Sequence, residues 1–221
     1  MRKIGTDLWE TRPDSPFPGL TTHAYLWTGG RDGNILFYSP ATEADFDRID
    51  ELGGIGHQYL SHQDEAGPML AAIHRRFDTR LHAPQPELAA IGAHRHVDVP
   101  LADRHVDTNG IEVIPSPGHT AGSTCYLLTA DDGTRLLFTG DTMFVGADGT
   151  WAPGYLPPMS DATTLAQTLH LLRTLTPDVV ISSAFPSDSA VHVLDGRPWA
   201  ACVDEALDAL AAAAPHSRFS S

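Results

Sequence analysis

Two short stretches in the second half of the chain place a histidine and an aspartate where a metal ion could sit. His119 follows the apolar, strand-like run 111–114 and lies in the sequence PSPGHTAGS. Asp141 follows the similar run 136–138 and lies in LFTGDT. Pro-Gly and Thr-Gly pairs end the two strands, so both side chains are expected at strand ends, where they can converge at a sheet edge.

These motifs resemble those of the metallo-β-lactamase superfamily, which has a GHT(x)GS histidine and a GD aspartate. The resemblance assigns the family's HxHxDH motif to residues 59–67, YLSHQDEAG. His62 occupies the place of the first histidine. Asp64 stands in the place of the second histidine, Ala66 in that of the aspartate and Gly67 in that of the third histidine. Half of the signature is therefore replaced, although the similarity spans most of the chain.

The family's last histidine follows a late strand, which the resemblance assigns to residues 179–185. Ser182, Ser183 or Ala184 holds that place, depending on the register. In the family, one metal takes the first two motif histidines and the GHT histidine. A second metal takes the other motif residues and the last histidine, and the GD aspartate bridges the two. Carried onto this chain, the resemblance implies a single metal site. Its implied ligands are His62, Asp64, His119 and Asp141.

Two imidazoles and two carboxylates suit Zn²⁺ best, and also Fe²⁺ or Mn²⁺. Three protein ligands with an open position lower the pKa of a bound water to about 7. We therefore predict a hydrolase with a mononuclear site, acting on a small ester, lactone or thioester, with Asp141 and Glu65 as catalytic residues. Glu65 is interpreted as a general base or an additional metal ligand. The alternative is a residue at the N-terminus of a helix, where its carboxylate faces the helix dipole. Asp64 has the alternative role of capping the helix expected to begin near residue 65.

Three further residues are candidates for contact with a substrate. His23 precedes a predicted strand, at a place where superfamily members bring a loop residue close to the pocket. Trp151 and Tyr155 lie in the segment 146–158, whose glycines and prolines predict a loop over the pocket mouth. The alternative for this segment is a surface loop whose tryptophan packs on the edge of the domain.

Other functions compete with that of a hydrolase. A catalytically inactive binding or scaffold protein is favoured by the lost and altered ligand positions. A redox site like that of the diiron members of the superfamily needs a nearly complete ligand set and a flavin-bearing partner domain, neither of which this sequence shows. A thioesterase like glyoxalase II is disfavoured, because that group keeps the full motif and adds a substrate domain.

Length and composition narrow the class of protein. The 221 residues fit a single domain spanning 1–221, and 42 % apolar with 19 % charged residues is ordinary for a soluble protein. The formal net charge is -14 and Lys3 is the only lysine, which argues against a nucleic-acid partner. Because the sequence shows no apolar leader and no long uncharged apolar run, we expect a cytoplasmic protein that does not enter a membrane. A small molecule is the expected partner, and a homo-oligomer is compatible with the sequence.

Predicted strands and helices alternate along both halves of the chain. The strands are expected at 24–28, 35–38, 57–60, 78–82, 97–101, 111–114, 124–128, 135–138 and 179–182. The helices are expected at 43–52, 65–77, 86–91, 161–175 and 199–213. Strands from both halves with helices outside predict an α+β fold, a four-layer αββα sandwich of metallo-β-lactamase type.

Overall fold

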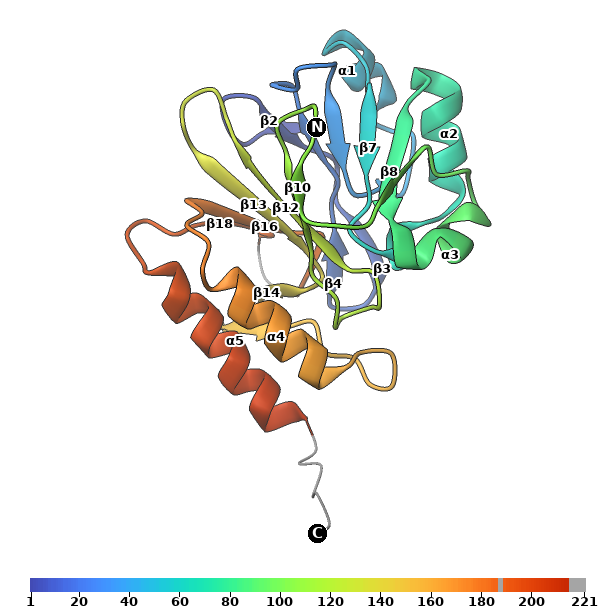
Figure 1. Ribbon diagram of the computed structural model, residues 1–221. Coiled ribbons are helices and arrows are strands. Elements are labelled where there is room, and N and C mark those ends of the chain that lie inside the picture. The colour runs from blue at the N-terminus through green and yellow to red at the C-terminus, as the bar shows by residue number, and fades with distance from the viewer. Residues whose placement is uncertain (187–188, 215–221) are drawn as a thin grey trace.

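The computed structural model describes residues 1–186 and 189–214, and in these two β-sheets lie face to face with helices on their outer sides (Figure 1). The predicted four-layer αββα arrangement is therefore confirmed. The outer layer on the first sheet contains α1 (Phe46–Glu51), α2 (Pro68–Phe77) and α3 (Leu88–Gly92). The outer layer on the second sheet contains α4 (Ala162–Leu172) and α5 (Trp199–Ala213).

The first sheet has seven strands in the order β1-β2-β5-β6-β7-β8-β9. These are β1 (Arg2–Lys3), β2 (Leu8–Glu10), β5 (Tyr25–Trp27), β6 (Ile35–Phe37), β7 (His57–Tyr59), β8 (Arg80–Pro84) and β9 (Val99–Leu101). The pairs from β1 to β6 are antiparallel, whereas β6, β7, β8 and β9 are parallel. Because parallel strands end at the same edge of a sheet, the residues that follow β6 and β7 lie side by side.

The second sheet has six strands in the order β10-β11-β12-β13-β16-β18. These are β10 (His105–Val106), β11 (Glu112–Pro115), β12 (Thr124–Thr129), β13 (Arg135–Gly140), β16 (Val179–Ser182) and β18 (Val191–Val193). β13 and β16 are parallel, so the residues after both strands also meet at one edge. Two small sheets flank this edge: the pair β14 (Met143–Val145) and β15 (Trp151–Pro153), and the trio β17 (Ala184–Phe185), β4 (Leu20–Thr22) and β3 (Asp14–Phe17).

An aromatic cluster fills the space between the two large sheets. Phe37 from β6 stacks on Phe138 from β13, with ring centroids 3.9 Å apart. Tyr59 and Tyr126 pack beside Phe37, and all four side chains are buried. Burying a side chain of this size contributes about 1.5–3 kcal/mol. The aromatic cluster therefore fixes the distance between the sheets, and with it the distance between the loops that leave them.

The helices are amphipathic and cover the outer faces. Leu70 of α2 packs with Leu81 of β8, whereas Leu165 and Cys202 of α4 and α5 pack with Leu137 of β13. In the part of the chain that is described, no helix is long and apolar enough to cross a membrane.

Two predicted segments differ in kind from the structure, apart from strands that were not predicted and shifts of a few residues at the ends of elements. The helix expected at 65–77 begins at Pro68, and residues 63–65 form a separate turn of 3₁₀-helix. The segment 146–158, expected to be a loop, instead contributes β15 to a hairpin with β14. The glycines around residue 149 form the tip of that hairpin, which is a second common use of glycine in a short segment.

Candidate metal centre

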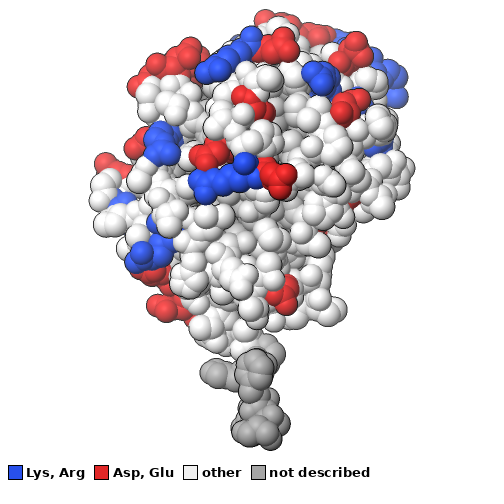
Figure 2. Space-filling model, viewed as in Figure 1, with Lys and Arg blue, Asp and Glu red and all other residues white. Residues whose placement is uncertain are grey.

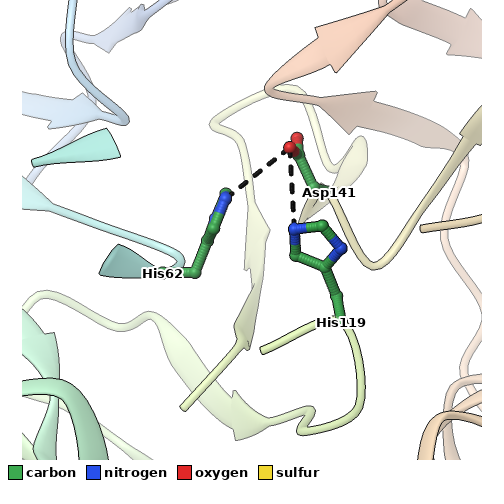
Figure 3. A group of neighbouring side chains, drawn as sticks. All are labelled: His62, His119 and Asp141. Atoms are coloured by element: carbon green, nitrogen blue, oxygen red, sulfur yellow. Dashed lines mark ion pairs between the residues drawn. The ribbon is translucent and has the colours of Figure 1, made fainter. Parts of the chain in front are cut away.

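Three side chains from separate loops meet at the shared edge of the two sheets (Figure 3). His62 follows β7, His119 follows β11 and Asp141 follows β13. One ligand atom from each lies within 4.8 Å of the others. The Oδ2 atom of Asp141 is 3.6 Å from Nε2 of His62 and 3.8 Å from Nε2 of His119. Residues far apart in the sequence thus form one group that could hold a metal ion.

The two imidazoles present unpartnered nitrogen atoms to this centre. Both His62 and His119 are 2 % exposed, and neither Nε2 atom has a hydrogen-bond partner among the described residues. The Nδ1 atom of His119 lies 2.7 Å from the carbonyl oxygen of Gly154, to which it donates. That hydrogen bond leaves the lone pair on Nε2, which is the tautomer that a metal ion needs. A buried nitrogen without a partner is costly unless a ligand satisfies it, so the donor set fits a metal ion.

A series of hydrogen bonds through Ser61 and Glu65 orients His62. Its Nδ1 atom donates to Ser61 Oγ at 2.8 Å, and Ser61 Oγ donates to Glu65 Oε1 at 2.5 Å. The other oxygen of Glu65 accepts the backbone N–H of Ser61 at 2.7 Å. Both oxygens of the carboxylate therefore bind Ser61, on the Nδ1 side of the imidazole. The catalytic role of Glu65 stays a prediction, but these contacts favour a positioning role.

Ser183 holds the carboxylate of Asp141. The Ser183 hydroxyl donates to Oδ1, which leaves Oδ2 directed at the two imidazoles. The sequence left the place of the family's last histidine open among residues 182–184, and the structure puts the side chain of Ser183 against Asp141. A hydroxyl at this point orients the aspartate but is a weaker metal ligand than an imidazole.

Gly140 allows the aspartate to approach His62. Its φ of 54° is left-handed, and a Cβ atom there would lie 2.2 Å from Ser61 Oγ. Its backbone N–H donates to the hydroxyl of Tyr38 at 2.9 Å, and that hydroxyl donates to the carbonyl of Ile181 at 3.0 Å. The glycine of the GD pair is thus required by both backbone conformation and space.

Sequence reasoning missed a buried carboxylate that joins two ligand-bearing loops. Glu87 is 3 % exposed. Its two oxygens accept the backbone N–H of Gln63, next to His62, at 2.7 Å and that of Gly122, in the loop of His119, at 2.9 Å. The only signal in the sequence was an acidic residue at the start of the helix expected at 86–91, which is common without such a role.

The charges around the centre favour a cation. Burial lowers the pKa of the His62 imidazole, but the carboxylates of Asp141, Glu65 and Asp64 outweigh burial and raise that pKa to about 9. The pKa of His119 is lowered, first by burial and then by the neighbouring His62, against the opposing effect of Asp141. A proton on His62 and a divalent ion at the centre would thus compete for the same carboxylates.

The group opens into a cavity of about 540 Å³. Asp64 lines this cavity with its side chain 49 % exposed, and Oδ2 lies 4.0 Å from His62 Nε2. It is not part of the compact three-residue group, so its role as a fourth ligand stays a prediction. His23 also lines the cavity, where its ring stacks on Phe185 at 5.6 Å and Nδ1 donates to the carbonyl of Thr11 at 2.8 Å.

The two aromatic residues predicted to contact substrate lie elsewhere. Trp151 is 3 % exposed and packs edge-on against Trp199 of α5, with centroids 5.6 Å apart. Tyr155 packs against the same core under α4 and α5, and neither side chain lines the cavity. Their segment reaches the centre through the carbonyl of Gly154 and the side chain of Leu156.

Comparisons with known proteins agree with this arrangement. A family model described as the metallo-beta-lactamase superfamily matches residues 47–184. A hydroxyacylglutathione hydrolase from Mesorhizobium japonicum is 36 % identical over 88 residues, which are 40 % of this chain and 32 % of that protein. The match therefore spans about a third of the length of that curated relative.

Solved structures share the fold at low sequence identity. A metallo-beta-lactamase from Pontibacter korlensis has a TM-score of 0.69 at 16 % identity, over 95 % of this chain and 97 % of that chain. The DIM-1 metallo-beta-lactamase has a TM-score of 0.72 at 11 % identity, over 96 % and 97 %. A protein from Cronobacter sakazakii, described by an HARLDQ motif, has a TM-score of 0.56 at 16 % identity, over 79 % and 78 %. With the family model matching more than half of the chain, this protein belongs to the metallo-beta-lactamase superfamily.

Proposed function

We propose that this protein is a metal-dependent hydrolase with a mononuclear centre held by His62, His119 and Asp141. The observation that carries the proposal is the pair of buried, unpartnered Nε2 atoms that face Asp141 Oδ2. Zn²⁺ fits two imidazoles and a carboxylate best, with Fe²⁺ or Mn²⁺ as the alternatives. When bound there, a divalent ion supplies a Lewis acid and lowers the pKa of water.

The remaining residues near the centre orient it or stay available for proton transfer. Glu65 and Ser61 hold the His62 ring, and Ser183 holds Asp141. The side chain of Asp64 is half exposed, and its Oδ2 atom lies 4.0 Å from His62 Nε2. This proximity supports the proposal that Asp64 acts as a fourth ligand or takes a proton from the attacking water. Hydrolysis would then form a bond between the acyl carbon and the water oxygen and break the bond from the acyl carbon to the ester oxygen or the thioester sulfur. The leaving group would take up a proton to become an alcohol or thiol, which stays attached to the product when the substrate is a lactone.

Small esters, lactones and thioesters are the proposed substrates. All three have a carbonyl carbon that an activated water can attack, and none requires a second metal to hold a phosphate. The name of the Mesorhizobium japonicum relative describes hydrolysis of a hydroxyacyl-glutathione, which supports a hydrolase in general terms.

A binding or scaffold protein without activity is the second candidate. One observation favours it: a protonated His62, whose pKa is raised to about 9, could pair with Asp141 in a metal-free protein. Such a protein would keep the fold and the cavity without a metal.

A panel of esters, lactones and thioesters separates the two candidates. Protein loaded with Zn²⁺, Fe²⁺ or Mn²⁺ is compared with protein stripped by a chelator, and His119→Ala is compared with His94→Ala, which changes an exposed histidine outside the cavity. We expect turnover in the loaded protein and in His94→Ala, and none in the stripped protein or in His119→Ala. Equal rates in loaded and stripped protein would rule out a metal-dependent hydrolase.

A further inference from the structure

The cavity at the metal centre combines negative charge with apolar surface. Four carboxylates line it, those of Asp14, Asp64, Glu65 and Asp141. None of the Lys or Arg residues in 1–186 and 189–214 lines it. Acidic side chains at the cavity are thus not matched by a side chain of fixed positive charge.

Several arginines of the described chain pair with carboxylates outside the cavity. Arg12 pairs with Asp45 at 3.3 Å, and Arg75 pairs with Glu43 at 3.7 Å, both away from the cavity lining. Figure 2 shows basic side chains beside acidic ones over one face of the molecule. Reaching an anion in the cavity would require such a side chain to leave its partner.

A bound divalent ion would offset two of the four negative charges and leave two. A substrate anion near these charges is repelled, and a single charge about 8 Å away weakens its binding about fivefold at low ionic strength, for an effective dielectric constant near 40. Asp14 is the carboxylate of the four that lies outside the loops of the metal centre, on β3. It therefore offers a way to change the field without touching the centre.

The rest of the wall is apolar. Its apolar side chains include Pro16, Leu20, Pro40, Pro68, Met69 and Leu156. Leu156 is 58 % exposed, so an apolar group bound there would cover surface that is otherwise in contact with water.

We propose that this cavity selects uncharged acyl substrates with an apolar chain and rejects substrates whose chain ends in a carboxylate. This choice of substrate class rests on the hydrolase function proposed above. This preference would distinguish the protein from enzymes whose substrates carry carboxylates, such as conjugates of glutathione.

Binding and turnover test the proposal separately. Calorimetry on the zinc-loaded protein compares N-butylhexanamide with the mono-N-butylamide of adipic acid, two unreactive ligands that differ by a terminal carboxylate. Hydrolysis compares the 4-nitrophenyl ester of hexanoic acid with the mono-ester of adipic acid. We expect the uncharged member of each pair to be preferred about tenfold or more, and the preference to shrink as salt is added.

Two variants locate the source of the preference. Asp14→Asn removes one charge at the cavity, and we expect it to raise the relative binding of the anionic amide about fivefold. Asp208→Asn removes the same charge from the exposed side of α5, away from the cavity, and we expect no change in that ratio. Equal effects of the two variants would overturn the assignment to the cavity.

The outcomes distinguish this inference from the hydrolase itself. Turnover with equal or better use of the anionic ester would overturn the substrate class and keep the hydrolase. Preferred binding of the uncharged amide without turnover of either ester would support the ligand class and refute the hydrolase. Absence of binding by both amides at millimolar concentration would overturn the inference.

Discussion

Two pairs of buried histidines in this molecule have opposite surroundings. In the first pair, His62 and His119, both Nε2 atoms lack a hydrogen-bond partner and face Asp141. In the second pair, Nδ1 of His57 lies 2.8 Å from Nε2 of His82. One nitrogen of each ring is therefore engaged in the hydrogen bond between the two rings. The second pair lies within β7 and β8, where His82 also stacks on Tyr59 at 4.1 Å.

The pKa shifts have opposite signs for one histidine of each pair, His62 and His82. The pKa of His62 is raised to about 9, because nearby carboxylates outweigh its burial. The pKa of His82 is lowered to about 3, by burial first and then by His57 and Arg80. Burial alone therefore does not distinguish a metal site from a structural pair. The first pair differs in that its two open Nε2 atoms converge on one carboxylate, that of Asp141. In the second pair the open nitrogen is Nδ1 of His82, whereas the carboxylate of Asp32 lies 3.7 Å from Nε2 of His57.

Substituting one histidine of each pair should have opposite effects on metal binding and on stability. His119→Ala removes one of three ligands, so we expect metal binding to be lost while the metal-free protein stays folded. His82→Ala leaves a cavity and an unpaired His57, so we expect the free energy of unfolding to fall by about 2–4 kcal/mol while metal binding is kept. Calorimetric titration with Zn²⁺ and urea unfolding measure the two effects. Loss of metal in both variants would erase the distinction.

Weakening the hydrogen bonds that orient a ligand should lower metal affinity less than removing the ligand does. Glu65→Gln replaces one acceptor oxygen by an NH₂ group that cannot accept from Ser61, so the orientation of His62 is weakened. We expect metal affinity to fall by about 10–100-fold with the fold retained. Competition with a chromophoric chelator measures it, and Glu43→Gln on the surface is the control. An unchanged affinity would show that the chain from Glu65 to His62 does not support the centre.

Acid should destabilise the protein through the second pair. The folded-state pKa of His82, about 3, lies below the unfolded value of about 6.5, so keeping this ring neutral contributes stability above pH 6.5. That contribution is lost as the pH falls from 6.5 toward 3, by at most about 1.4 kcal/mol per pH unit. Urea unfolding at several pH values checks the slope, which should be smaller in His82→Gln than in the parent. The same slope in both proteins would assign the acid sensitivity to other groups.

The smallest effect is expected at Trp151, which belongs to neither pair. Trp151→Phe keeps an aromatic ring against Trp199, so we expect the free energy of unfolding to fall by about 1 kcal/mol and KM to stay unchanged. Steady-state kinetics on an active ester gives KM. A several-fold rise in KM would restore the contact with substrate that its sequence position predicts.

Periodicity and turn residues predict the elements that carry the ligands. The strand at 179–182 and the helix at 199–213 agree with β16 and α5 in both bounds. β11 ends at Pro115, one residue beyond its predicted end and just before the Pro-Gly pair. β13 runs through the Thr-Gly pair to Gly140, two residues beyond its predicted end, with an irregularity in the ladder between Phe138 and Gly140. The early strands β1 to β4 were not predicted, since each has only two to four residues, too few to show hydrophobic alternation.

The partners of the ligands could not be predicted in the same way. The contact of Ser183 with Asp141 spans 42 residues, and Glu87 bonds to Gly122 across 35. Such contacts depend on how the two sheets pack, which no local pattern encodes. The burial of Trp151 could not be predicted for the same reason. Its segment does reach His119, but through the carbonyl of Gly154 and not through an aromatic side chain.

The metal content of the purified protein tests the central claim most directly. Protein expressed in medium supplemented with zinc and iron is dialysed and analysed for transition metals. With three converging ligands and no second such group in residues 1–186 and 189–214, we predict about one equivalent per chain. No bound metal, or two equivalents per chain, would contradict the mononuclear centre at His62, His119 and Asp141.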